Sequence, residues 1–156
     1  MYTRGEKKAL IKEFWKSFDD FCNLDPMLAW RKKKWMLHRT GINNIDLKFE
    51  AGRQATRVIL ELNHRDEDRR LEMWERILKF KSVLEQQLEG ELHYHLIYIR
   101  ESGEEVSRIY TELKDVDVHR KLDWPRMFSF MADKMDILQQ NFLDFSDFIK
   151  DENWEE

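Results

Sequence analysis

The stretch ATRVILELNHRDEDRRLEMWERILKFKSVLEQQLE, residues 55–89, decides the fold. It begins with large apolar residues at a spacing of two, Val58, Leu60 and Leu62, which predicts a β-strand with one buried face. Farther along, apolar residues recur at steps of three and four, which predicts one long helix that ends before Gly90. Its apolar stripe, with Trp74 as the expected core anchor, comprises Leu71, Trp74, Ile77, Leu78, Phe80, Leu84 and Leu88.

Composition bounds the class of protein. At 156 residues, 42% of them hydrophobic, the chain is long enough to bury a core and is expected to form a single domain, residues 1–156. Its net charge of −4 argues against a surface that binds nucleic acid everywhere, although it allows a local basic patch. No apolar run reaches the roughly 18 residues that a membrane-spanning helix needs. A single cysteine, Cys22, fits a buried thiol in a reducing cytoplasm.

Outside residues 55–89, the patterns predict two N-terminal helices, two β-hairpins and a C-terminal helix. The expected bounds are about 6–24 and 26–38 for the N-terminal helices, 45–50 with 55–62 and 92–99 with 105–113 for the hairpins, about 44–113 for the sheet with its central helix, and about 124–149 for the C-terminal helix. We therefore expect an α+β fold, in which the two hairpins form a four-stranded, mostly antiparallel sheet and flank the long central helix, with the terminal helices packed on the sheet. The strand order stays open. If the second and third strands are neighbours, the central helix forms a right-handed crossover between parallel strands.

Two predicted elements carry more apolar surface than a partly exposed element needs. In the strand at 92–99, Leu96 and Tyr98 alternate with Ile97 and Ile99, which predicts that both of its faces are covered. The C-terminal helix carries an apolar stripe of Phe128, Met131, Met135, Leu138, Phe142, Phe145 and Phe148. The last three of these phenylalanines either complete the core, which is the preferred interpretation, or form an interface, most simply in a symmetric dimer.

Several short strings also occur together in a familiar order. They are Phe14-Trp15, Ala55-Thr56-Arg57-Val58, FKSVLE at residues 80–85, Ser107-Arg108-Ile109-Tyr110, and Asp123-Trp124-Pro125 followed by Met127, Met131 and Met135. Over roughly residues 10–145 the chain resembles the bacterial family known as domain of unknown function 4268. In that family the domain often follows a PD-(D/E)xK-type nuclease domain, so the resemblance implies a neighbourhood of bacterial DNA metabolism or defence. It implies no activity, because the family offers no catalytic or binding residues to carry over.

Asp46 and Glu61 are the candidate catalytic residues of an alternative interpretation, a metal-dependent nuclease. The predicted hairpin leaves Glu61 on the face opposite the apolar residues of its strand, where it can pair with Asp46. A PD-(D/E)xK site uses two such carboxylates to hold a divalent metal ion, and a lysine two residues after the second one. Here that position is Asn63, and alternating charges are also what any solvated strand face shows. The preferred interpretation is therefore not an enzyme.

A basic cluster departs most strongly from the acidic background. It consists of Trp30, Arg31, Lys32, Lys33, Lys34, Trp35 and Arg39. Basic residues interleaved with aromatic ones suit phosphate contact and base stacking, so the basic cluster is the candidate site for nucleic acid or another partner. The preferred interpretation is a short amphipathic helix whose lysines are merely solvated, because charge runs usually are.

These patterns favour a binding or accessory domain. His93 and His95 share a strand face, but a zinc site needs three or four ligands, so we expect neither a metal ion nor a cofactor. The expected partner is an unknown protein or a second copy of the chain, with weak nucleic-acid binding through the basic cluster. We expect a cytoplasmic protein that does not contact a membrane.

Overall fold

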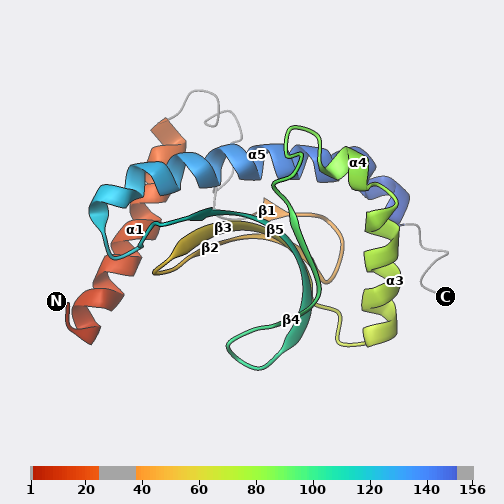
Figure 1. Ribbon diagram of the computed structural model, residues 1–156, viewed down its shortest axis with the longest axis horizontal. Helices are drawn as coiled ribbons and strands as arrows, with labels where there is room; N and C mark the ends of the chain where they lie inside the picture. Colours follow the sequence, from red (N-terminus) through yellow and green to blue (C-terminus); the bar gives the residue numbers. More distant parts are fainter. Residues whose placement is uncertain (1, 25–37, 151–156) are drawn as a thin grey trace.

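The computed structural model describes residues 2–24 and 38–150 (Figure 1). The elements are α1 (Arg4–Leu24), β1 (His38–Arg39), β2 (Ile45–Ala51), β3 (Ala55–Leu62), α3 (Glu67–Leu78), α4 (Lys81–Leu84), β4 (His93–Ile99), β5 (Glu105–Lys114), the 3-10 helix η1 (Lys121–Asp123) and α5 (Trp124–Ile149). The helix predicted at about 26–38 and the basic cluster as far as Trp35 lie outside the described residues. Within those residues, none of the helices has the length and apolar character needed to cross a membrane.

The strands form one antiparallel sheet in the order β1-β2-β3-β5-β4. Both predicted hairpins, β2–β3 and β4–β5, are present, so the α+β class with an antiparallel sheet is confirmed. Strand β3 pairs with β5 along its whole length, which separates β3 from β4. The parallel neighbours that the open strand order allowed are therefore not formed. The short strand β1 adds a fifth strand beside β2.

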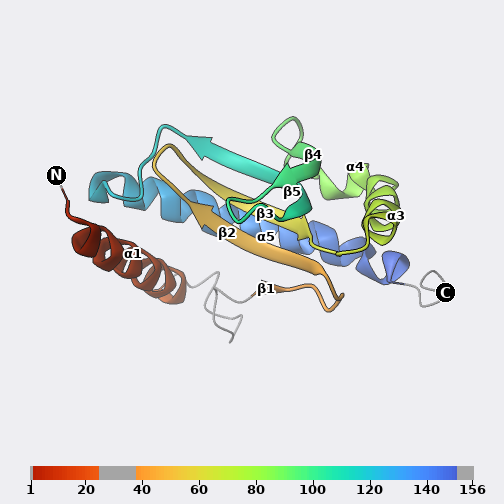
Figure 2. The ribbon, with the colours of Figure 1, turned by 90° about the horizontal axis from the view of Figure 1, so that it is seen from below.

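Helix α5 runs across one face of the curved sheet, with α1 near one end of α5 and α3 near the other (Figure 1 and Figure 2). The covered face is the convex one. Val58, Leu60 and Leu62 of β3 are fully buried in the core, as the spacing of two predicts. In the described part of the chain, no helix covers the opposite, concave face (Figure 1). The convex face therefore holds the core, and the concave face is available for other roles.

The predicted central helix is two helices, α3 and α4. The N–H of Phe80 bonds to the carbonyl of Ile77, and this tighter turn ends α3. The ring of Phe80 then stacks on that of Phe145 in α5, with centroids 5.0 Å apart. Two residues of the predicted stripe, Leu71 and Leu78, are exposed by 41% and 36%. The prediction was wrong for them because α3 buries the face that carries Met73, Trp74 and Ile77, and both leucines lie off that face.

The part of the stripe that faces the core is confirmed. Trp74 is buried and packs edge-to-face on Tyr94 of β4, with ring centroids 6.4 Å apart. Asp66 caps α3, because its Oδ1 accepts hydrogen bonds from the N–H groups of Asp68 and Arg69. Gly90 has a φ of 77°, a left-handed conformation that glycine adopts without strain, but α4 ends at Leu84, so Gly90 does not end the helix as predicted.

Strand β4 contradicts the prediction of two covered faces. It is an edge strand, and Leu96, Ile97 and Ile99 are exposed by 37%, 62% and 56%. The pairing with β5 shifts between His95 and Tyr98, which marks a β-bulge. The prediction took apolar residues on both faces as a sign of burial, but β4 lies at the edge of the sheet, where it has only β5 as a neighbour.

Helix α5 buries most of its predicted stripe. Phe142 and Phe145 lie in the core, packed edge-to-face with ring centroids 5.3 Å apart. Phe148 is 68% exposed and stacks on Phe80 at 5.8 Å. Of the three phenylalanines weighed as interface residues, Phe148 is thus the one that lies on the surface, and an interface through it stays a prediction. Cys22 of α1 is buried, as expected.

Candidate functional site

Polar side chains of the strands gather on the concave face because side chains alternate along a strand. Strand pairing sets them in rows across the sheet. The first row is Asp46, Glu61, Arg108 and His95. The second row is Lys48, the apolar Ile59, Tyr110 and His93. The third row is Glu50, Arg57 and Glu112. Together with Tyr98 and Arg100, these residues are called the concave cluster.

Glu61 lies at the centre of the concave cluster and is fully buried. Its Oε1 accepts a hydrogen bond from Nε of Arg108 at 2.8 Å, and its Oε2 accepts one from Nζ of Lys48 at 3.1 Å. Arg100 also donates to Oε2. Burial raises the pKa of Glu61, but these three cations outweigh burial and hold the pKa below its ordinary value. Glu61 is therefore an ionised carboxylate with both oxygens occupied.

The ion pairs continue from Glu61 across the strands. Arg108 donates to Glu50 at 3.2 Å, and Arg57 donates to Glu50 at 3.3 Å and to Glu112 at 2.9 Å. Burial lowers the pKa of Arg57, but its hydrogen bonds to Glu112 and Tyr98 outweigh burial and raise the pKa above its ordinary value. Because Glu50, Arg57, Glu61, Arg108 and Glu112 come from three strands, their contacts hold the concave face in one arrangement.

Aromatic rings and histidines occupy the β4 side of the cluster. Tyr110 stacks on His93, with ring centroids 5.1 Å apart, and its hydroxyl lies 3.3 Å from Nε2 of His95. Burial raises the pKa of Tyr110. The guanidinium of Arg57 lies 4.7 Å from the Tyr110 ring centre, within range of a cation–π contact. The two histidines share a face, as predicted, and their rings are part of a stacked group.

The β-bulge in β4 decides which side chains join the cluster. Leu96 and Ile97 lie between the pairs His95–Arg108 and Tyr98–Val106, opposite Ser107 alone. This extra residue reverses the alternation, so that Tyr98 falls on the concave face, where the Arg108 guanidinium lies 4.1 Å from its ring centre. Arg100 follows two residues later and reaches Glu61 for the same reason.

The structure brings together the two candidate nuclease carboxylates. Asp46 pairs directly opposite Glu61 in the β2–β3 ladder, on the same face. Asn63, at the position where a nuclease motif has lysine, donates to Oδ2 of Asp46 at 2.7 Å. A metal ion at Glu61 would have to displace a cation from one of its oxygens. Across residues 2–24 and 38–150 there is no group of three or more His, Cys, Asp or Glu residues that could hold a metal ion.

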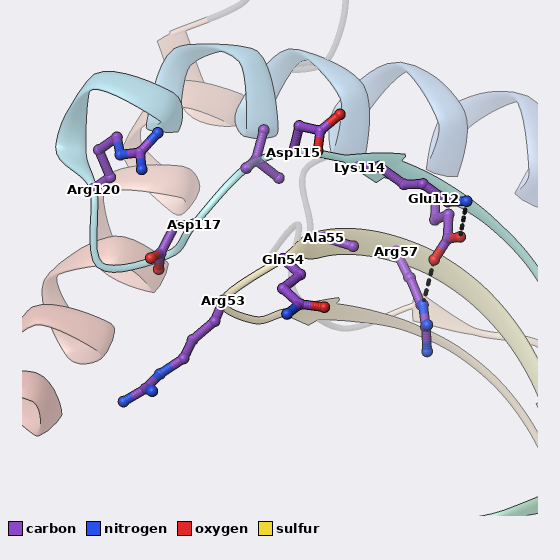
Figure 3. Close-up of a pocket in the computed structure, with 10 residues that line it drawn as sticks. Arg53, Gln54, Ala55, Arg57, Glu112, Lys114, Asp115, Asp117 and Arg120 are labelled. Atoms are coloured by element: carbon purple, nitrogen blue, oxygen red, sulfur yellow. Dashed lines mark hydrogen bonds and ion pairs between the residues drawn. The ribbon is translucent and has the colours of Figure 1, made fainter.

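Two hollows lie at opposite ends of the strands. The turn hollow, about 700 Å³, lies by the β2–β3 turn; Figure 3 shows its Arg57 and Glu112 joined by their ion pair. The arginine hollow, about 490 Å³, lies where β3 leads into α3. It is lined by Asn44, Asn63, His64, Arg65, Asp66, Arg69, Arg100 and Glu104. Each hollow shares residues with the concave cluster, so the uncovered face runs from one to the other.

Sequence reasoning found Asp46, Glu61 and the histidine pair of this face, and it missed Arg57, Arg100, Arg108 and the tyrosines. A signal existed for some of these, because Arg108, Tyr110 and Glu112 alternate with Ile109, Thr111 and Leu113 in β5. For Arg100 no such signal exists, since its place depends on the bulge. Of the predicted basic cluster, only Arg39 falls in a described element, β1.

The comparison with known protein families identifies the family of this chain. The family model described as "Domain of unknown function (DUF4268)" matches residues 10–146. The comparison with curated proteins found no match, and neither did the comparison with solved structures. Because the family match spans most of the chain, this protein belongs to the DUF4268 family.

Proposed function

We propose that this protein is a non-enzymatic binding module, an accessory domain that contacts a protein partner through its concave face. The observation that carries the proposal is the state of Glu61, whose two oxygens are held by Arg108, Lys48 and Arg100. A catalytic carboxylate needs an oxygen free for a metal ion, water or a proton. In this protein both oxygens of Glu61 are occupied by ion pairs, so neither is free for a metal ion, water or a proton. The buried charges instead stabilise a surface.

The concave face has two properties that suit recognition of another protein. Its cross-strand ion pairs fix the side chains in place, which lowers the ordering cost of association. His93 and His95 are exposed at its β4 side. The ion-paired side chains, counted with Lys114 and Glu104, comprise five cations and four carboxylates. This near balance of charge suits a protein partner that makes directional polar contacts better than it suits a polyanion.

The setting of this module follows from the family resemblance. A bacterial, cytoplasmic accessory domain that works beside proteins of DNA metabolism or defence, such as a nuclease, is the setting we propose. The partner is then a protein of that machinery, and the concave face supplies the contact.

A co-purification experiment tests the binding proposal. Tagged wild-type protein and the variant His93→Ala/His95→Ala are recovered from the native host. A matched control, Ile11→Ala/Leu122→Ala, truncates two exposed side chains on α1 and η1 instead. We expect a stoichiometric partner with the wild type and the control, and its loss with the histidine variant. If all three proteins recover the same partner, the concave face is not the contact surface.

The nuclease remains a second candidate because Asp46 lies opposite Glu61 and Lys48 lies 3.1 Å from that carboxylate. Plasmid and single-stranded DNA are incubated with the protein and with Mg²⁺ or Mn²⁺, beside Asp46→Asn and Glu61→Gln. We expect no cleavage by any of these proteins. Cleavage by the wild type that both substitutions abolish would replace the binding module with a nuclease.

Nucleic-acid binding through the basic cluster also stays a prediction. If Lys32, Lys33 and Lys34 contact phosphates, affinity for single-stranded DNA falls steeply with added salt, because binding releases counterions. Replacing all three with glutamate should then abolish binding and leave the melting curve unchanged. No affinity at low salt would mean that these lysines are only solvated.

A further inference from the structure

We propose that the arginine hollow is a binding site for a phosphomonoester group, such as the terminal phosphate of a nucleotide or of a nucleic acid strand. The hollow lies at one end of the partner surface proposed above and shares Arg100 with it, but the site would stand even if the concave face bound no protein. Three features of its described residues carry the proposal: the polarity of its lining, its unpaired arginines and its engaged carboxylates.

The lining is wholly polar and comes from several segments of the chain. Residues before β2, after β3, in the first turn of α3, after β4 and before β5 all contribute, and none of the eight is apolar. Because strand ends and a helix start converge here, the hollow has a fixed frame. Asn44 and Asn63, for example, are joined by a backbone hydrogen bond of 2.9 Å.

Among the residues that the structure describes, Arg65 and Arg69 are the arginines of the hollow that lack an ion pair. Both are exposed, both line the hollow, and within the described ranges neither has an ion-pair partner. By contrast, Arg57, Arg70 and Arg108 each pair with a carboxylate. Two unpaired guanidinium groups at one hollow present planar sets of donors, which match the oxygens of a phosphate.

The carboxylates of the hollow are already engaged. Asp66 accepts the first N–H groups of α3, and Glu104 pairs with Arg100. The end of the helix is therefore capped, and the attraction for an anion comes from the arginines. Arg100 also lines the hollow, but its guanidinium is already paired with Glu61 and Glu104.

The turn hollow makes a useful contrast. Its Arg57 and Lys114 are tied to Glu112, and its Arg120 lies 3.6 Å from Asp123. Asp115 and Asp117 add negative charge to the same wall. The larger hollow thus has most of its cations neutralised, whereas the arginine hollow keeps two guanidinium groups without a counter-ion. An anion is therefore expected at the smaller one.

Titrations with three probes test the site. They are inorganic phosphate, a short single-stranded oligonucleotide with a 5′-phosphate, and the same oligonucleotide with a 5′-hydroxyl. Binding is followed by calorimetry and by the NMR signals of the arginine Nε–H groups. We expect the wild type to bind phosphate, with shifts at Arg65 and Arg69, and to prefer the 5′-phosphorylated strand over the hydroxyl form. Preference for the strand over inorganic phosphate would identify a nucleic acid end as the source of the group.

The variant Arg65→Gln/Arg69→Gln should lose at least about tenfold in affinity for phosphate, because both charge-assisted contacts are removed. Arg4→Gln/Arg53→Gln removes the same charge from exposed arginines outside the hollow and should bind like the wild type. Matching melting curves of the three proteins exclude unfolding as the cause. An equal loss in both variants, or a wild type that does not bind phosphate, would overturn the proposal.

Discussion

The convex and concave faces of the sheet are built from the same strands, yet they are held by different interactions. In β3, Val58, Leu60 and Leu62 pack under α5 by apolar contact, while Arg57 and Glu61 on the opposite face of the strand join ion pairs. Apolar packing tolerates a change of partner if volume is kept, whereas a buried charge needs its particular partners. The comparison teaches that the concave face is the more specific of the two and the less forgiving of change.

The largest expected effect tests the apolar side. Trp74→Ala should lower the free energy of unfolding by about 3–5 kcal/mol, because it removes a large buried side chain and leaves a cavity. Leu71→Ala, on the exposed side of the same helix, should cost less than about 1 kcal/mol. Urea unfolding followed by circular dichroism measures both. Equal losses would mean that α3 faces the sheet with its other side.

A smaller effect tests the charged side. Glu61→Gln keeps the volume but removes the charge that Arg108, Lys48 and Arg100 share, and should cost about 2 kcal/mol. Glu101→Gln, at an exposed turn, should change the stability by less than about 0.5 kcal/mol. A Glu61 variant as stable as the wild type in urea would show that the concave face is held by packing alone.

The stabilisation from Glu61 should depend on pH. Its pKa in the folded protein lies below the ordinary value of 4.5, so the stabilisation is complete above that pH and is lost as pH falls toward the folded-state value. The difference in unfolding free energy between the wild type and Glu61→Gln should therefore shrink between pH 6 and pH 3. A difference that stays constant over this range would contradict an ionised Glu61 as the source of the effect.

The smallest expected effect concerns the ring that the bulge supplies. Tyr98→Phe removes the hydroxyl to which Arg57 donates at 3.3 Å and keeps the ring beneath Arg108. We expect a loss of about 1 kcal/mol, the usual worth of one hydrogen bond. Tyr98→Leu removes the cation–π contact as well and should cost more. Thermal unfolding ranks the two variants, and an inverted order would mean that the ring contributes nothing.

The sequence allowed one face to be predicted far better than the other. The spacing of Val58, Leu60 and Leu62 is a local signal, so the strand and its buried face follow from it directly. Glu61 could be placed opposite Asp46 because a short hairpin fixes that pairing. Its other partners depend on contacts distant in the chain, and local periodicity carries no information about those.

Two partners of Glu61 show why. Arg108 reaches it because β5 lies between β3 and β4, a strand order that the sequence left open. Arg100 reaches it because one extra residue in β4 reverses the alternation. The break between α3 and α4 could not be predicted for a related reason. Phe80 continues the helical spacing in the sequence, and the contact that it makes, stacking on Phe145, is distant in the chain.

The bulge in β4 also bears on colloidal behaviour. Residues 93–99, HYHLIYI, hold no Lys, Arg, Asp or Glu, and they form an edge strand with exposed Leu96, Ile97 and Ile99. Such a strand is a template on which other chains can add, and eventually a seed for aggregates. The bulge interrupts the regular edge and so hinders such addition. Straightening β4 by deleting Ile97 should therefore lower the solubility of the protein.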